Sequence, residues 1–236
     1  MTERSRAGVR REARQFVIGP SRVEWAHDAL TIHVDEVGVP FPKRVRGTVR
    51  VRPRGLASLV AALDDGGRHR WAPIAPCARV EVEMDQPGLR WQGHGYLDSN
   101  EGDEPIDRPF VEWDWSRGSL ADGGTGVVYD VQPKQGSERV IACRFKPSGE
   151  AEAFEPPPRQ PLPSTGWRIE RRMRSDAGVA PHVTRRLEDT PFYARSVLES
   201  GLLGERVTSV HETLNLPRLT SPVVQAMLPW RMPRRG

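Results

Sequence analysis

Apolar and polar residues alternate with a period of two over most of the chain, and this pattern predicts short β-strands. In residues 29–35, Leu30, Ile32 and Val34 fall on one face and polar side chains fall on the other. Gly, Pro, Asn and Asp separate such segments, as is typical of turns. The predicted strands cover residues 16–20, 22–25, 29–35, 45–51, 79–85, 89–98, 110–117, 126–131, 138–145, 166–171, 182–187, 192–198 and 205–214.

Helical periodicity is scarce by comparison. Only residues 56–63 and 218–228 show it, and both segments predict short helices. Residues 155–163 are rich in proline and predict a stiff extended connection, not a central strand. Strands without crossover helices pair antiparallel, so the pattern predicts an all-β fold built from barrels or sandwiches.

The composition agrees with a polar globular protein. A chain of 236 residues, with 37% hydrophobic and 28% charged residues, suggests one large or two small domains. The sequence contains no apolar run of the roughly 20 residues that a membrane helix needs, and its first residues lack the apolar core of a signal peptide. Cys77 and Cys143 make neither a disulfide framework nor a zinc site, and we expect two small buried side chains in a reducing cytoplasm.

The formal net charge of +4 is unevenly distributed along the chain. Residues 1–54 hold twelve basic and six acidic residues, whereas residues 98–122 hold two basic and eight acidic ones. In residues 43–52 the basic side chains alternate with apolar ones, which predicts the outer face of a half-buried strand. This pattern argues against nucleic-acid binding and favours attraction to an anionic membrane surface.

The most unusual predicted strand is residues 89–98. His94, Tyr96 and Asp98 share one of its faces, because side chains alternate along a strand. A loop is predicted to follow from residue 99, which would place Asp98 at the end of the strand. There Asp98 is either a working carboxylate or a residue whose side chain caps the turn.

Two further segments supply candidate residues. His69 and Trp71 are one residue apart, so they share a face if residues 64–76 are extended. The turn predicted at residues 85–88 brings this region beside the strand that carries Asp98. Trp113 and Trp115 also share a strand face, where they line either a pocket or the core.

Taken together, three motifs resemble the carotenoid 1,2-hydratases, also called hydroxyneurosporene synthases. The motifs are His69-Arg-Trp71, Gly93-His-Gly-Tyr-Leu-Asp-Ser-Asn100 and Trp113-Asp-Trp-Ser-Arg117, in this order. The likeness covers most of the chain and is most specific over residues 64–131. It implies two tandem lipocalin-like antiparallel β-barrel or sandwich domains, with residues 1–104 in the first and 105–236 in the second. Family members carry a segment before the part matched by Met1, so we expect the first domain to be incomplete.

The resemblance also implies a reaction. The family adds water across the terminal C1=C2 double bond of acyclic carotenes such as neurosporene and lycopene, without a cofactor or a metal. The matching catalytic residues are His69, Trp71, Tyr96 and Asp98, with the aspartate as proton donor. His94, Trp113 and Trp115 are then candidates for substrate binding. A carotene dissolves in a bilayer, so the implied location is the cytoplasmic face of the inner photosynthetic membrane, as a peripheral protein.

The chemistry suits these residue types. A carboxylic acid held protonated in an apolar pocket can protonate an alkene. Aromatic faces such as those of Trp71 and Tyr96 stabilise the resulting cation by roughly 2 kcal/mol each when desolvated. His69 would orient Asp98 or the attacking water. Two other hypotheses stay open: a lipocalin-like binder of an apolar ligand without catalysis, and a related isomerase or cyclase, because a fold does not fix a reaction.

Overall fold

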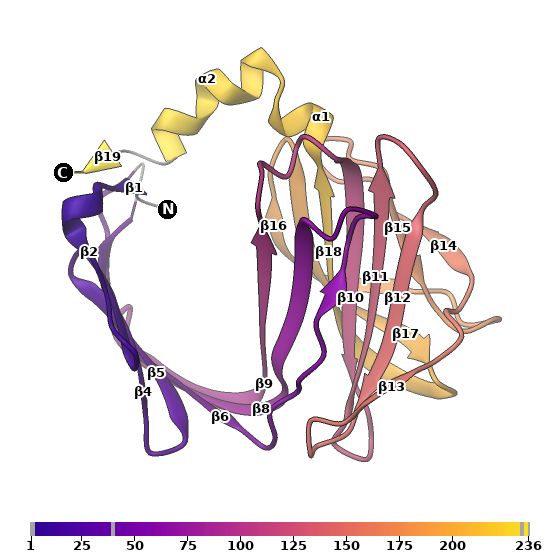
Figure 1. The fold of residues 1–236 in the computed structure, drawn as a ribbon, viewed down its shortest axis with the longest axis horizontal. Helices are drawn as coiled ribbons and strands as arrows, with labels where there is room; N and C mark the ends of the chain where they lie inside the picture. Colours follow the sequence, from indigo (N-terminus) through magenta and orange to yellow (C-terminus); the bar gives the residue numbers. More distant parts are fainter. Residues whose placement is uncertain (1–2, 39–40, 232–233, 236) are drawn as a thin grey trace. The chain divides into compact units, whose positions relative to one another are not determined.

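A computed structural model describes residues 3–38, 41–231 and 234–235, and it consists mainly of antiparallel strands (Figure 1). The all-β prediction is therefore confirmed. The strands are β1 (Glu3–Arg4), β2 (Val9–Arg11), β3 (Gln15–Ile18), β4 (Ser21–Ala26), β5 (Ala29–Val37), β6 (Arg44–Pro53), β7 (Ala61–Ala62), β8 (His69–Gln86), β9 (Leu89–Gly102), β10 (Phe110–Ser119), β11 (Thr125–Pro133), β12 (Arg139–Phe145), β13 (Ala151–Ala153), β14 (Arg159–Leu162), β15 (Arg171–Arg174), β16 (His182–Asp189), β17 (Tyr193–Leu202), β18 (Glu205–Asn215) and β19 (Arg234–Arg235).

Helical structure is confined to short segments. A single 3-10 turn spans Arg6–Gly8, and two helices follow β18, α1 (Leu216–Leu219) and α2 (Pro222–Arg231). The helix predicted near residues 218–228 is thus present, divided by a turn. None of the helices in the described part of the chain is both long and apolar enough to cross a membrane.

The chain divides into two compact units. Unit 1 comprises Met1–Arg54, Ala78–Tyr96 and Gln225–Gly236, and unit 2 comprises Gly55–Cys77 and Leu97–Val224. This division groups the residues differently from the two tandem domains that the sequence predicts. The predicted domain boundary between residues 104 and 105 stays a prediction.

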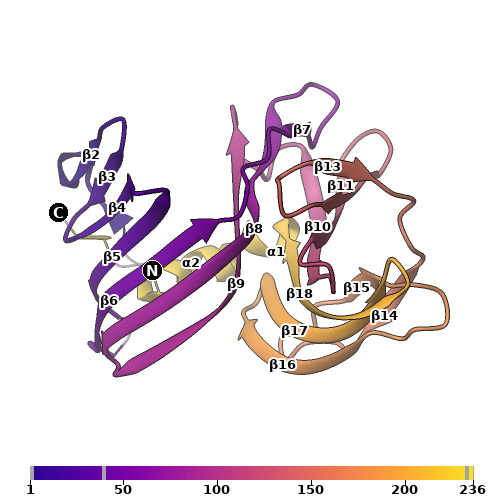
Figure 2. The same ribbon diagram turned by 90° about the horizontal axis from the view of Figure 1, so that it is seen from below.

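Unit 1 is built on a meander in which β2 to β6 pair in chain order and β6 then pairs with β8 (Figure 2). Alternation places Val51 opposite Val80 across the β6–β8 pair, and both side chains are buried. The intervening Arg50 and Arg52 lie within 3.6–3.9 Å of Glu81. This is the arrangement predicted for residues 43–52, with valines on the buried face and arginines on the outer one.

Unit 2 contains a seven-stranded sheet in the order β13-β12-β11-β10-β18-β17-β16. One of its faces carries the aromatic residues Trp113, Trp115 and Tyr129, because these alternate with polar residues along β10 and β11. The opposite face carries Asp114 and Asp130. The separate β14–β15 hairpin packs against this second face, since Arg159 and Arg174 of the hairpin both bond the Asp130 carboxylate.

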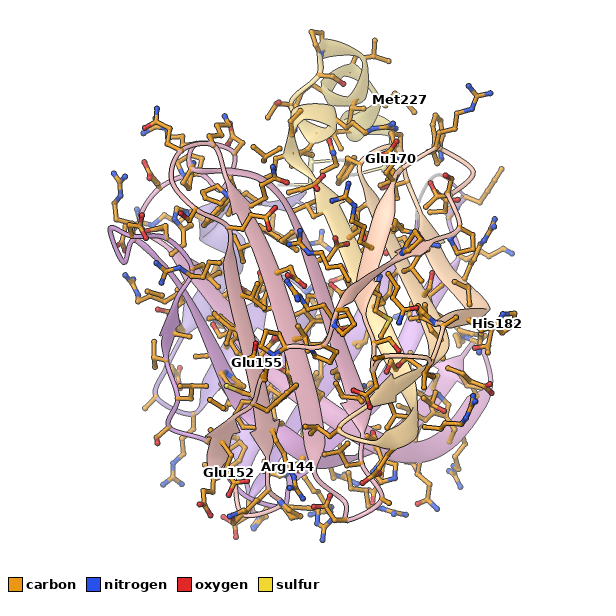
Figure 3. The ribbon with its side chains drawn as sticks, turned by 90° about the vertical axis from the view of Figure 1, so that its right-hand side faces the viewer. Arg144, Glu152, Glu155, Glu170, His182 and Met227 are labelled. Carbon is orange, nitrogen blue, oxygen red and sulfur yellow. The ribbon has the colours of Figure 1, made fainter. Side chains whose placement is uncertain are left out.

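The edge strand β13 of the seven-stranded sheet forms an ion pair through Glu152 with Lys146, the residue after β12, at 2.6 Å. Arg144 of β12 pairs in register with Glu152 of β13, and Figure 3 shows these two side chains at the same end of the unit. Arg144 also donates to Asp122 in the β10–β11 turn at 2.6 Å. The hairpin predicted at residues 121–124 is confirmed. Cys77 and Cys143 are buried, as predicted.

Three local predictions were wrong. Residues 56–60 are irregular rather than helical, and their apolar Leu56 and Val60 are 56% and 60% exposed. Residues 166–170 form no strand, because a turn with Arg168 at a φ of 57° precedes β15. Finally, β9 continues to Gly102, so Asp98 lies inside a strand and not at its end.

Candidate functional site

The side chains of Trp71 and Asp98 form the centre of the candidate site in unit 2. Trp71 lies on the buried face of β8 and has no exposed surface. Its indole Nε1–H donates a hydrogen bond to Asp98 Oδ2 at 2.9 Å. Asp98 itself is only half-buried in β9, the strand that pairs with β8. The structure therefore joins two of the predicted catalytic residues and leaves the carboxyl as the more accessible partner.

Rings from neighbouring strands surround Trp71. Tyr129 of β11 and Phe145 of β12 approach its ring edge-on, at centroid distances of 5.8 and 6.3 Å. Trp113 of β10 packs on Tyr129 at 6.2 Å, and Phe110 packs on Trp113 at 6.3 Å. We call these five residues the aromatic cluster. Edge-to-face pairs of this kind each contribute about 0.5–1.5 kcal/mol beyond their burial, so the cluster holds Trp71 rigidly.

Tyr129 brings a phenol close to Asp98. Burial raises the pKa of the Tyr129 hydroxyl, and the negative charge of Asp98 raises it further. The hydroxyl donates to Asn100 Oδ1 at 3.4 Å. It therefore stays neutral and acts as a fixed dipole beside the carboxylate. Sequence reasoning did not select Tyr129, although it stands opposite Trp115 in the predicted hairpin.

His69 is held by two acceptors. Its Nδ1 lies 2.7 Å from Asp64 Oδ2, and its Nε2–H donates to the backbone carbonyl of Glu104 at 3.0 Å. Gly102 leaves room for the ring, because a Cβ there would come within 2.7 Å of His69 Cδ2. These bonds tie the start of β8 to the end of β9. The predicted role of His69 toward Asp98 or water stays a prediction.

The other predicted site residues lie in different surroundings. Trp115 is buried in the sheet of unit 2, with 8% of its surface exposed. Trp113 is half-buried. His94 is exposed and Tyr96 is half-buried, and both belong to unit 1. Their contributions to the site stay predictions.

Comparison with known proteins decides the family. The family model described as carotenoid hydratase CrtC matches residues 1–236. The chain belongs to the CrtC carotenoid hydratase family. The resemblance drawn from the three sequence motifs is thereby confirmed.

Curated relatives agree with this assignment. The chain is 63% identical to an acyclic carotenoid 1,2-hydratase of Rubrivivax gelatinosus over 236 residues and 52% identical to one of Thiocapsa roseopersicina over 237 residues. Each match covers 100% of this chain but only 58% of the relative. The Rhodobacter capsulatus protein of the same name is 36% identical, with 100% of this chain and 84% of the relative covered.

A solved structure supports the fold. A crystal structure from Nitrosomonas europaea, of a protein provisionally named AttH, superimposes with a TM-score of 0.61 at 14% identity. The match covers 89% of this chain and 71% of the other. At this identity the likeness shows the fold alone.

The sheet face opposite the aromatic cluster carries a second polar group, in which His211 and Thr213 are buried and Asp114 is half-buried. Asp114 Oδ1 accepts a hydrogen bond from Thr213 Oγ1 at 2.5 Å and lies 3.5 Å from His211 Nε2, which donates to the carbonyl of Arg172. Burial raises the pKa of Asp114 to about 7 and lowers that of His211 to about 4. Folding therefore favours the uncharged form of both groups. The motif search selected the flanking tryptophans and missed Asp114 between them.

In the described part of the chain, no three His, Cys, Asp or Glu side chains come together in a way that could hold a metal ion. The candidate site offers a carboxyl, an indole N–H, a phenol and aromatic faces.

Proposed function

We propose that this chain carries the proton-donating site of a hydratase that adds water across the terminal C1=C2 double bond of acyclic carotenes such as neurosporene and lycopene. The observation that carries the proposal is the Trp71–Asp98 hydrogen bond beside the aromatic cluster, in a chain of the CrtC family. The relatives' name, acyclic carotenoid 1,2-hydratase, supplies the substrate class.

Asp98 is the acid in this proposal. Asp98 Oδ2 accepts the Trp71 N–H, and we assign the transferable proton to the other oxygen, Oδ1. Proton transfer from Oδ1 to C2 of the alkene leaves a tertiary cation at C1. Water adds to C1, and the proton that it then loses restores the acid. The sum is the addition of one water, and the residues themselves supply the acid–base chemistry without a cofactor.

The aromatic residues have separate roles. Trp71 and Tyr129 are fully buried, so they position Asp98 and set its surroundings. Trp113 is partly exposed, and we assign to it the face that the developing cation meets. A desolvated aromatic face stabilises a cation by roughly 2 kcal/mol. His69, Tyr96, His94 and Trp115 keep the roles that the sequence predicts for them.

We place the protein at a membrane surface. A long hydrocarbon substrate partitions into the bilayer, and the basic balance of residues 1–54 favours an anionic leaflet. The proposed location is the cytoplasmic face of the inner photosynthetic membrane, with peripheral attachment. Nucleic acid is not among the proposed partners.

Product analysis tests the hydration. Lycopene or neurosporene is incubated with the purified chain in detergent-dispersed form in D2O, with the Rubrivivax gelatinosus hydratase as positive control. We expect a 1-hydroxy product that carries one deuterium at C2. Bound but unchanged carotene would mean a binding protein, and an altered carbon skeleton would mean an isomerase or cyclase. Either result contradicts the proposal.

Replacing Trp71 tests the hydrogen bond to Asp98. Trp71→Phe keeps an aromatic ring and removes the N–H donor. Losing a hydrogen bond to a charged group costs about 1.5–3 kcal/mol, so the hydration rate at saturating carotene should fall about 10- to 100-fold with an unchanged KM. Trp71→Leu should be slower still, because the ring is also lost.

The control for packing is Phe145→Leu. Phe145 is as deeply buried as Trp71 and touches the same ring, but its side chain has no polar atom. Phe145→Leu should lower the temperature of unfolding and reduce the hydration rate much less than Trp71→Phe does, because the Trp71 N–H remains to bond Asp98. If Trp71→Phe and Phe145→Leu have equal rates, Trp71 only fills space.

A further inference from the structure

A small pocket lies on unit 2 away from the aromatic cluster. Its volume is about 280 Å³, and it is lined by Pro163, Arg171, Val183, Thr184, Arg185 and Arg186. Pockets for drug-sized ligands usually measure about 300–1,000 Å³, so this one suits a compact group rather than a long hydrocarbon. Three of its six lining residues are arginines, which indicates an anionic ligand.

Arg171 is the buried member of the three. Only 3% of its surface is exposed. Its two terminal nitrogens donate to Ser196 Oγ at 2.8 Å and to the carbonyl of Pro163 at 2.9 Å. Its Nε–H is buried and has no acceptor among the residues that the structure describes. Both bonded acceptors are neutral, so within the described residues no carboxylate hydrogen-bonded to Arg171 balances its buried charge, and an anion in the pocket would stabilise it.

Arg186 places a second guanidinium beside Arg171. It stands directly opposite Ser196 in the β16–β17 pair, and Ser196 bonds Arg171. Cross-strand partners share a sheet face. Burial lowers the pKa of Arg171, and the positive charge of Arg186 lowers it further. An anion bound between the two guanidinium groups would offset their Coulomb repulsion.

The neighbouring charges do not neutralise this group. Arg185 and Arg186 are exposed and make no ion pair with any residue that the structure describes. The negative charges of Asp114 and Asp189 raise the pKa of Arg171. However, burial keeps Asp114 partly protonated near neutral pH, with a pKa of about 7, and Asp189 supplies a single negative charge beside the arginines. The pocket therefore keeps an excess of positive charge.

We propose that Arg171 and Arg186, which face the same side of the sheet, form a binding site for a phosphate group. Guanidinium forks match the oxygens of phosphate in a bidentate manner. The phosphate is either a soluble ion or ester, or the headgroup of a phospholipid. This site lies on the sheet face opposite Trp113 and is independent of the proposed hydration.

The first experiment titrates inorganic phosphate by calorimetry at constant ionic strength, set with chloride. Arg186→Gln removes one exposed guanidinium and should weaken phosphate binding about tenfold. Arg206→Gln on β18 is the matched control, because Arg206 is also an exposed strand arginine and lies outside the pocket. It should bind phosphate as the parent does. Equal affinities in the parent and Arg186→Gln, or no binding by any of them, would overturn the proposal.

The second experiment separates the two sources of phosphate. Flotation is measured with phosphatidylcholine vesicles that contain phosphatidic acid. A loss of flotation in Arg186→Gln but not in Arg206→Gln identifies a lipid headgroup. Unchanged flotation together with weakened binding of inorganic phosphate identifies a soluble ligand. Both outcomes support the site, whereas equal behaviour of the two variants in both experiments contradicts it.

Discussion

Asp98→Asn should abolish carotene hydration while the fold and carotene binding persist. The amide keeps the shape of the side chain and can still accept the Trp71 hydrogen bond. It carries no transferable proton, and a positioned general acid contributes about 10²–10⁴-fold to a rate. The measurement is the formation of 1-hydroxycarotene, with unfolding temperature and carotene affinity recorded on the same preparations.

Two further variants sharpen this experiment. Asp98→Glu keeps the acid but moves it by about 1 Å, enough to cost on the order of a hundredfold in rate. Asp103→Asn is the control, because Asp103 lies nearby in sequence, pairs with Arg70 at 3.0 Å and is 59% exposed. Its rate should match that of the parent. If Asp98→Asn hydrates lycopene as fast as Asp103→Asn, Asp98 has a structural role only.

The strands could be predicted because burial on one face of a sheet imposes a period of two on the sequence. This holds for residues 29–35 and 79–85, which lie in β5 and β8. The helix predicted at residues 56–63 was wrong because the apolar residues there are not buried on one face. Its apolar Leu56 and Val60 are exposed, so their spacing does not report a buried helical face. Strand length was also underestimated, since polar residues after Asp98 still pair with β8.

The candidate site could be predicted only in part. Trp71 and Asp98 lie on strands linked by a recognisable turn, and local alternation was enough to bring them together. Tyr129 comes from a hairpin further along the chain, and its contact with Trp71 depends on which sheet faces pack together. Such packing is a non-local property that alternation along one strand does not specify. The same is true of His69, whose partner Glu104 contributes a backbone carbonyl.

The opposite pKa shifts of Asp114 and His211 should cancel in the pH dependence of the free energy of unfolding. Between about pH 4 and 6.5, unfolded His211 carries a proton and unfolded Asp114 does not, whereas in the folded chain the reverse holds. Each state thus binds one proton on the pair, and the pair adds no slope to the free energy of unfolding in this range. Single substitutions remove this compensation.

Asp114→Asn removes a group whose pKa is raised on folding, from 3.8 to about 7. The stability that its proton provides is complete below pH 3.8 and is lost as the pH rises to 7. The free energy of unfolding of the variant, relative to that of the parent, should therefore rise by about 3 kcal/mol over this range. His211→Gln removes a group whose pKa is lowered on folding, from 6.5 to about 4. The free energy of unfolding of that variant, relative to that of the parent, should rise by about 3 kcal/mol as the pH falls from 6.5 to 4.

Urea unfolding of the parent, both single variants and the double variant at pH 4, 5, 6 and 7 measures these differences. Taking each variant relative to the parent cancels the other titrating groups, since they are present in both. The double variant should differ from the parent by a constant amount between about pH 4 and 6.5, because both opposing contributions are gone. Parallel pH profiles for the parent and the two single variants would show that Asp114 and His211 do not exchange their charged forms for neutral ones on folding.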